Sequence, residues 1–231
     1  MPLPRLRLDR AVDPSESITL LRGASRVLWL QGQAPPPRLQ QVYLALQGRL
    51  LEPGVRAVPT PGPSPGRNPW ALRQDRQRPL RWGPSEGLDG LHTLAEWMAQ
   101  EGIDSLDAVV FAGLCADLAD QPLRALLRQL APCLSADAPF LLMEPNGRNA
   151  RRVARSLLAS PDHRGEGRGT ARTVEELRRL LETGGLGLTS AGAVGGSRKR
   201  DRLARRVLGA DASAEWLLVT GRAIRGGEDL R

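Results

Sequence analysis

LDAVVFAGLCADLADQPLRALLRQLAPCLSADAPFLLMEPN, residues 106–146, predicts a strand, a helix and a second strand. The apolar run 108–111 (AVVF) has the length of a strand that is buried on both faces. Between residues 121 and 134 leucines recur at three- and four-residue spacing, which is typical of one face of a helix. A second apolar run, 140–143 (FLLM), follows. Two buried strands joined by a helix form a right-handed βαβ unit, so the stretch predicts an α/β protein with a parallel sheet.

The same stretch resembles the second half of a class I S-adenosylmethionine-dependent methyltransferase of the small-molecule type. In that family the corresponding segment follows the pattern FDxVVxxxxLxHLxDPxxxLxxLxxxLxPGGxLLxxxPN. The matching positions are Asp107, Val109, Val110, Leu118, Asp120, Pro122, Leu126, Leu130, Leu134, Leu141, Leu142, Pro145 and Asn146. The family's histidine before the aspartate is absent, and its Gly-Gly pair is replaced by Asp137-Ala138. The resemblance implies a Rossmann-like, seven-stranded, mostly parallel sheet with an antiparallel last strand and helices on both faces.

The turn after the first expected strand departs from the family. Residues 26–30 (RVLWL) predict that strand, and QGQA follows. The family's turn reads VLDLGCGTG and passes under the methionine and ribose parts of the cofactor, where a Cβ would collide with the ligand. Here only Gly32 remains, and three prolines, 35–37, come next. A simple strand-to-helix turn explains a lone glycine equally well, so both interpretations stay open.

The resemblance implies a site for S-adenosylmethionine at the carboxyl ends of the first and fourth strands, the usual ligand crevice of an open parallel sheet. The implied cofactor-binding residues are Leu30, Gln31, Gly32, Gln33, Ala112, Gly113 and Leu114. Glu144 and Asn146, which end the fifth strand, would face the methyl acceptor. His163, in the polar stretch 160–169, is the candidate for a general base. The sequence identifies no catalytic residue beyond these three candidates and no metal ligand.

Residues 25–224 are the expected methyltransferase-like domain, between an N-terminal extension (1–24) and a tail (225–231). Ile18 to Leu21 could begin a short helix or an added edge strand. Residues 55–58 and 78–82 are expected as the second and third strands, with a proline-rich insertion or linker at 59–75 between them. In the family an acidic residue at the end of the second strand binds the cofactor ribose, and nothing acidic directly follows residue 58.

Two later segments complete the expected sheet. Thr173 and Glu176 form a capping box at the start of a helix that ends at Gly184-Gly185. Residues 186–188 are the expected sixth strand. Residues 215–222 resemble the final antiparallel strand, which in the family inserts between strands five and six.

The net charge of +8 is compatible with a nucleic-acid partner. The candidate contacts are Arg148, Arg151, Arg152, Arg155, Arg198, Lys199 and Arg200. Of the 33 basic residues only Lys199 is a lysine, and the chain also holds 25 glycines and 19 prolines. A genome-wide bias toward arginine, glycine and proline codons explains that composition as well, so the charge does not by itself indicate a partner.

Several protein classes find no support in the sequence. No apolar run approaches the length of a membrane span, and no apolar stretch follows the basic N-terminus as in a secretory signal. Cys115 and Cys133 lack the spacing of a metal site, and we expect buried, reduced thiols in a cytoplasmic protein. Nucleotide-binding Walker motifs and the HExxH and GxSxG motifs are also absent.

The sequence leaves three functions open. The first is methyl transfer from S-adenosylmethionine to a small-molecule acceptor, which depends mainly on holding the methyl group in line with the nucleophile. The second is a non-catalytic methyltransferase-like fold that acts as a binding or scaffold protein, which the lost glycines favour. The third is binding of RNA or another polyanion, with an affinity that falls steeply with salt.

Overall fold

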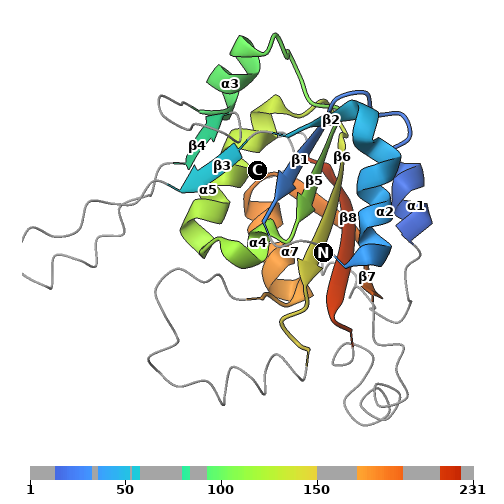
Figure 1. Cartoon of the computed structure of the whole chain (residues 1–231). Coiled ribbons are helices and arrows are strands. Elements are labelled where there is room, and N and C mark those ends of the chain that lie inside the picture. The colour runs from blue at the N-terminus through green and yellow to red at the C-terminus, as the bar shows by residue number, and fades with distance from the viewer. Residues whose placement is uncertain are drawn as a thin grey trace, which may run out of the picture.

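A six-stranded β-sheet forms the centre of the fold (Figure 1). The computed structural model describes residues 14–32, 36–52, 54–57, 80–83, 93–149, 171–194 and 214–224. In spatial order the sheet contains β2 (Leu50–Leu51), β1 (Val27–Gln31), β5 (Ala108–Ala112), β6 (Pro139–Pro145), β8 (Trp216–Ala223) and β7 (Leu186–Val194). The first four strands are parallel, and β8 runs antiparallel to β6 and β7. The expected Rossmann-like α/β class is confirmed, and the described residues contribute six strands to this sheet, where seven were expected.

The predicted βαβ unit is formed by β5, α5 (Asp120–Leu130) and β6. Its helix buries the leucine face that the sequence indicated, including Leu123, Leu126, Leu127 and Leu130. The last strand, β8, lies between β6 and β7, which confirms the insertion expected from the resemblance.

The strand beside β1 differs from the prediction. Leu50 and Leu51 form β2 and pair with Val27 and Leu28. The expected second and third strands belong instead to a separate antiparallel pair, β3 (Gly54–Ala57) and β4 (Leu80–Gly83). In the sequence, Leu39, Val42, Tyr43, Leu46 and Leu50 recur at helical spacing, which predicts a helix over residues 38–51 that would include both leucines. In the structure the helix α2 (Pro37–Leu46) ends earlier, and a 3₁₀ turn, Gln47–Arg49, leads into β2.

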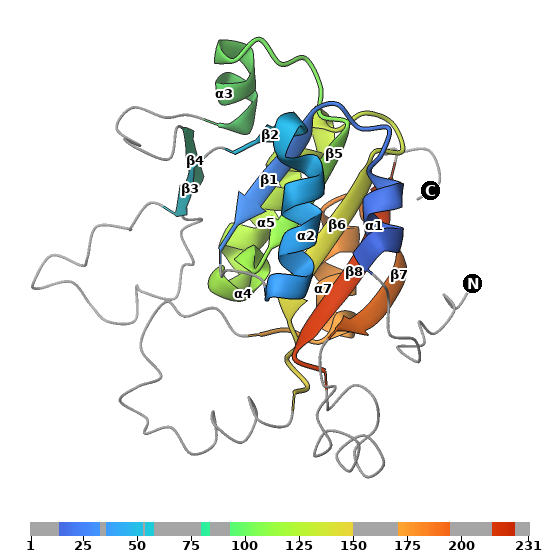
Figure 2. The same ribbon diagram turned by 45° about the vertical axis from the view of Figure 1, so that its right-hand side comes forward.

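Helices cover both faces of the sheet (Figure 2). Side chains alternate along β1, so that Leu28 and Leu30 enter one apolar core while Val27 and Trp29 enter the other. The first core packs under α3 (Leu94–Gln100), α5 and α7 (Val174–Thr183). The second packs under α1 (Pro14–Leu20) and α2. The sheet is therefore buried on both faces, as the continuous apolar runs of β5 and β6 predicted.

Local caps define the helix ends. The predicted capping box of α7 is present, since the Thr173 hydroxyl accepts from the Glu176 amide at 3.2 Å and Glu176 accepts from the Thr173 amide at 2.7 Å. Residues 14–20 are helical, which decides the question that the sequence left open at Ile18. Arg49 holds the turn after α1, where its Nη1 donates to the carbonyls of Arg22 and Ala24 at 2.8 and 2.9 Å.

The linker 59–75 and the tail 225–231 lie outside the described residues, as do residues 1–13. The two cysteines are buried free thiols, as expected. None of the helices in the described ranges is long and apolar enough to cross a membrane. Among those same ranges, no three His, Cys, Asp or Glu side chains gather in a way that would hold a metal ion.

Candidate functional site

The strand order reverses between β1 and β5. From β1 the chain crosses over α2 to β2 on one side, and it later returns to form β5 on the other side. In open parallel sheets, ligands bind outside the carboxyl ends of the strands at such a switch point. Here the two strand ends are neighbours, because Gln31 pairs with Ala112 and the Gly32 amide donates to the Ala112 carbonyl at 2.9 Å. The predicted adjacency of these strands is confirmed.

The residues expected to bind the cofactor have different environments at this edge. Leu30, Ala112 and Leu114 are buried in the core, so they offer mainly backbone groups. Gln31 is exposed, and its side-chain oxygen accepts from Trp29 Nε1 at 3.3 Å. Gln33 lies outside the described residues.

Gly32 lies against the chain on the other side of the switch point. A Cβ at this residue would lie 2.5 Å from Asp117 Oδ2 and 2.8 Å from the Gly113 carbonyl oxygen. Gly113 itself has a φ of 71°, a left-handed conformation that suits glycine. Glycine is thus required at both strand ends, and at Gly32 the close neighbour is the protein itself. The exposed Asp117 carboxylate is a residue of this edge that the sequence reasoning missed.

A one-turn helix, α4 (Leu114–Asp117), forms the β5 side of this edge. Glu144, at the end of β6, accepts from the backbone amides of Cys115 and Ala116 at 2.9 and 3.0 Å. Its side chain is only 1% exposed. Burial raises the pKa of Glu144 to about 7, although these hydrogen bonds and the charge of Arg172 act to lower it. Burial also raises the pKa of the Cys115 thiol, and the Glu144 charge adds to that effect.

Arg172 holds the other end of α4. This arginine is 6% exposed, and it donates from Nη1 to the Cys115 carbonyl and from Nη2 to the Leu118 carbonyl, the latter at 2.7 Å. It also forms an ion pair with Asp120 at 2.8 Å. The one-turn helix is therefore held by a buried carboxylate at its amino end and by a buried guanidinium at its carboxyl end.

The other two catalytic candidates are Asn146 and His163. Asn146 is 2% exposed, donates from Nδ2 to the Ala214 carbonyl at 3.0 Å and accepts from the Arg148 amide at 3.0 Å. It links the end of β6 to the chain that enters β8. His163 lies outside the described residues.

A carboxylate follows β2 directly, and the sequence reasoning missed it because it placed the second strand later. Glu52 comes after Leu51, and its Oε2 accepts from the Tyr43 hydroxyl at 3.4 Å. The Glu52 charge, followed by burial, raises the pKa of Tyr43. The Tyr43 ring packs edge-on against Trp29 at a centroid distance of 5.1 Å. The signal in the sequence was the pair Leu50-Leu51 followed by an acid.

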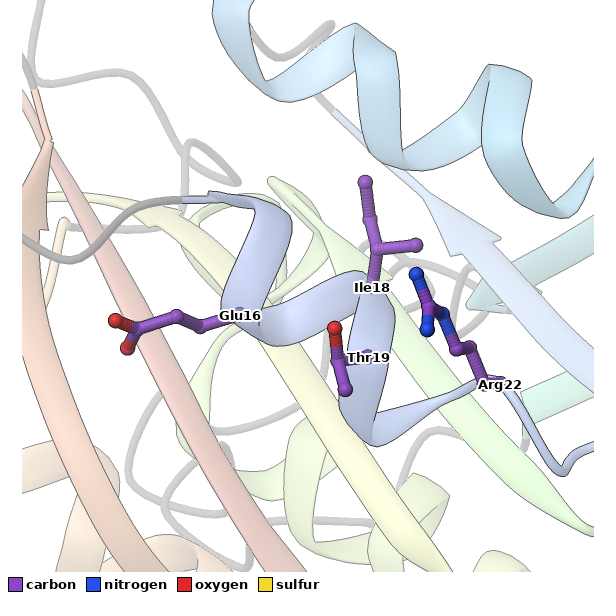
Figure 3. Close-up of a pocket in the computed structure, with 4 residues that line it drawn as sticks. All are labelled: Glu16, Ile18, Thr19 and Arg22. Carbon is purple, nitrogen blue, oxygen red and sulfur yellow. The ribbon is translucent and has the colours of Figure 1, made fainter.

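Two other surface features involve α1 and Arg148. A shallow hollow of about 410 Å³ is lined by Glu16, Ile18, Thr19 and Arg22, which belong to α1 and the turn after it; Glu16 points away from Ile18 and Arg22 (Figure 3). Arg148, a candidate nucleic-acid contact, forms an ion pair with Glu175 at 3.2 Å. The remaining candidate contacts, Arg151, Arg152, Arg155, Arg198, Lys199 and Arg200, lie outside the described residues.

Comparison with known proteins gives likenesses of structure alone. No protein-family model matches the chain, and no curated protein matches it. Among solved structures, human N-acetylserotonin methyltransferase in complex with S-adenosylmethionine is 15% identical, with a TM-score of 0.45, over 92% of this chain and 52% of that one. A Burkholderia thailandensis 1,6-didemethyltoxoflavin-N1-methyltransferase is 16% identical, with a TM-score of 0.45, over 91% and 76% of the two chains.

An S-adenosylmethionine-dependent methyltransferase from Mesorhizobium loti is 15% identical, with a TM-score of 0.35, over 52% of this chain and 62% of that one. The chain thus spans about half the length of the human protein and less than two thirds of the M. loti protein. These likenesses are distant, whereas the strand order itself defines the fold. The family that the sequence resembles recurs among these distant structural neighbours.

Proposed function

We propose that the chain binds S-adenosylmethionine outside the carboxyl ends of β1 and β5 and transfers its methyl group to a small-molecule acceptor. The observation that supports this most is the switch point itself, where the two strand ends are joined by the hydrogen bond from the Gly32 amide to the Ala112 carbonyl. Each strand end carries a glycine, and Gly32 is partly exposed whereas Gly113 is buried.

The groups at this edge fit the chemistry of that cofactor. Gln31 and Asp117 place an amide and a carboxylate beside Gly32, and a carboxylate attracts the positively charged ammonium and sulfonium groups of the ligand. Glu52, which follows β2, is the proposed ribose ligand, because one carboxylate accepts hydrogen bonds from both hydroxyls. The other proposed contacts are the backbone groups of Leu30, Gly32, Ala112, Gly113 and Leu114, together with Gln33.

The cofactor supplies an electrophilic methyl group when it is bound. The chain then has to hold that group in line with the acceptor and exclude water, since orientation accounts for much of the acceleration in such a transfer. Glu144 and Asn146 are both engaged with the backbone, so neither is placed as a proton acceptor in this conformation. We therefore propose an acceptor whose nucleophile needs no base at the working pH. An acceptor that is protonated would need one, and His163 remains the proposed base for that case.

Titration calorimetry with S-adenosylmethionine and with S-adenosylhomocysteine tests this proposal. We expect both compounds to bind with a dissociation constant below about 1 mM, equivalent to roughly 4 kcal/mol or more of binding free energy. An absence of binding heat at millimolar ligand would end the enzymatic proposal. Given binding, release of S-adenosylhomocysteine in the presence of a panel of small phenols, amines and thiols identifies the acceptor class.

A further inference from the structure

The position of α4 determines how the two strand ends meet. Gly113 begins this turn and Asp117 ends it, and both lie against Gly32 across the switch point. A helix of four residues has too few internal hydrogen bonds to be stable by itself. What holds α4 in place therefore also determines the shape of the edge where the ligand is proposed to bind.

Two buried charged side chains from distant parts of the sequence hold α4. Glu144 accepts the backbone amides of Cys115 and Ala116, and Arg172 donates to the carbonyls of Cys115 and Leu118. Above about pH 7, where Glu144 is ionised, its negative charge is at the amino end of the turn and the positive charge of Arg172 is at the carboxyl end. This is the favourable arrangement for the helix dipole. Both charges therefore stabilise the same orientation of the turn.

The backbone that carries Arg172 is itself fixed. The Gly147 amide donates to the Arg172 carbonyl at 3.0 Å, and a Cβ at Gly147 would lie 2.7 Å from the Arg172 carbonyl carbon. The ion pair with Asp120 connects the guanidinium to the start of α5. The end of β6, the start of α5 and the segment that leads into α7 thus meet at α4.

Buried charges contribute little net stability to a core, because apolar side chains of similar volume often give equal or greater stability. Here each charged side chain forms hydrogen bonds with specific backbone groups of a single turn, and these bonds fix the orientation of that turn. We propose that Glu144 and Arg172 are positioning residues, which hold α4 in the orientation that the crevice between β1 and β5 needs for its ligand. This inference rests on the proposed function and adds the residues on which the ligand affinity depends.

Amide hydrogen exchange combined with calorimetry tests the inference. The variants are Glu144→Gln, which keeps the size but removes the charge, and Arg172→Lys, which keeps the charge but cannot engage the same set of acceptors. The matched control is Glu182→Gln, which removes a carboxylate from the partly exposed pair with Arg178 on α7. In both test variants we expect exchange at residues 115–118 to accelerate about tenfold or more, because a charge-assisted hydrogen bond is lost. Exchange within α7 should change less than about twofold, and the affinity for S-adenosylhomocysteine should fall about tenfold. The control should match the wild type in exchange at residues 115–118, in exchange within α7 and in affinity for S-adenosylhomocysteine.

Each outcome bears on one proposal or the other. If exchange accelerates equally at α4 and within α7, the variants have lost stability in general, and the inference is overturned. If exchange accelerates at α4 but the affinity for S-adenosylhomocysteine is unchanged, the two side chains have a structural role only, which also overturns the inference. If the wild type binds neither adenosyl compound, the proposed function fails, while the exchange data still decide whether the two side chains hold α4. If Glu144→Gln does not fold, the wild type alone is decisive: saturating S-adenosylhomocysteine must slow exchange at Cys115 and Ala116 more than within α7, and equal protection overturns the inference.

Discussion

At Glu144, burial and hydrogen bonding have opposite effects on the pKa, and burial is the larger. The pKa of about 7 in the folded protein exceeds the ordinary value of 4.5, so the folded state keeps a proton that the unfolded state releases between these pH values. The contribution of Glu144 to the free energy of unfolding is therefore full below pH 4.5 and decreases as the pH rises to about 7.

This pKa predicts a pH-dependent difference between the wild type and Glu144→Gln, whose side chain does not titrate. From pH 5 to pH 8 the free energy of unfolding of the variant should gain about 2 to 3 kcal/mol relative to the wild type. Urea unfolding at the two pH values measures this difference. A constant difference would mean that the Glu144 carboxyl titrates at its ordinary pKa.

At Gly32, the prediction concerns a single added methyl group. Gly32→Ala places a Cβ 2.8 Å from the Gly113 carbonyl oxygen, so α4 and the end of β1 have to move apart. We expect a loss of about 1 to 3 kcal/mol in the free energy of unfolding and a weaker affinity for S-adenosylhomocysteine.

The matched control for Gly32→Ala is Gly23→Ala, because a Cβ at Gly23 meets nothing within 4 Å. Its free energy of unfolding should stay within about 0.5 kcal/mol of the wild type. Urea denaturation and calorimetry compare the two variants. Equal behaviour would contradict the close contact between Gly32 and α4.

The roles of these single residues could be predicted only in part. The resemblance implied that the ends of the first and fourth strands, at Gly32 and Gly113, frame one site, and the structure places them side by side. The contact of Glu144 with the Cys115 amide joins residues 29 positions apart, and nothing in the local pattern indicates it. The sequence placed Glu144 correctly at the end of a strand, but it could not show which way the buried carboxylate turns.

The helices and strands with strong local signals agree with the prediction. The capping box of α7 and the leucine face of α5 both depend on spacings of three and four residues. By contrast, β2 has two residues and continues the leucine spacing of the preceding segment, so no periodicity distinguishes it from helix. The carboxylate after that strand, Glu52, was missed for the same reason.

Burial along the helices gives a test at the scale of an element. Leu127, on α5, is fully buried against the core and packs on Gly184 at the end of α7, whereas Leu44, on α2, is 66% exposed. We expect Leu127→Ala to lower the free energy of unfolding by about 2 to 5 kcal/mol and Leu44→Ala to change it by less than about 0.5 kcal/mol. The urea midpoints of the two variants provide the comparison. Similar losses of unfolding free energy in the two variants would contradict the burial of Leu127 and of the α5 face in the core.

For the molecule as a whole, the charge of +8 is the property that the site does not explain. Arg148 is already paired with Glu175, and its partners in the sequence pattern lie outside the described residues. If codon bias accounts for the arginines, binding to a labelled RNA should be weak at low salt and lost by about 0.2 M salt. Fluorescence anisotropy over a salt series measures this. Tight binding that persists at that salt concentration would favour a nucleic-acid partner instead.

Binding at the switch point is tested most directly by mapping amide chemical shifts in labelled protein as S-adenosylhomocysteine is added. The amides of Gln31, Gly32, Gly113, Leu114 and Asp117 should shift together along one saturating curve. Those of Thr189 and Ser190, on the outer strand β7, should stay in place. Shifts that are confined to another part of the molecule, or no shifts at millimolar ligand, would show that the ends of β1 and β5 do not form the ligand site.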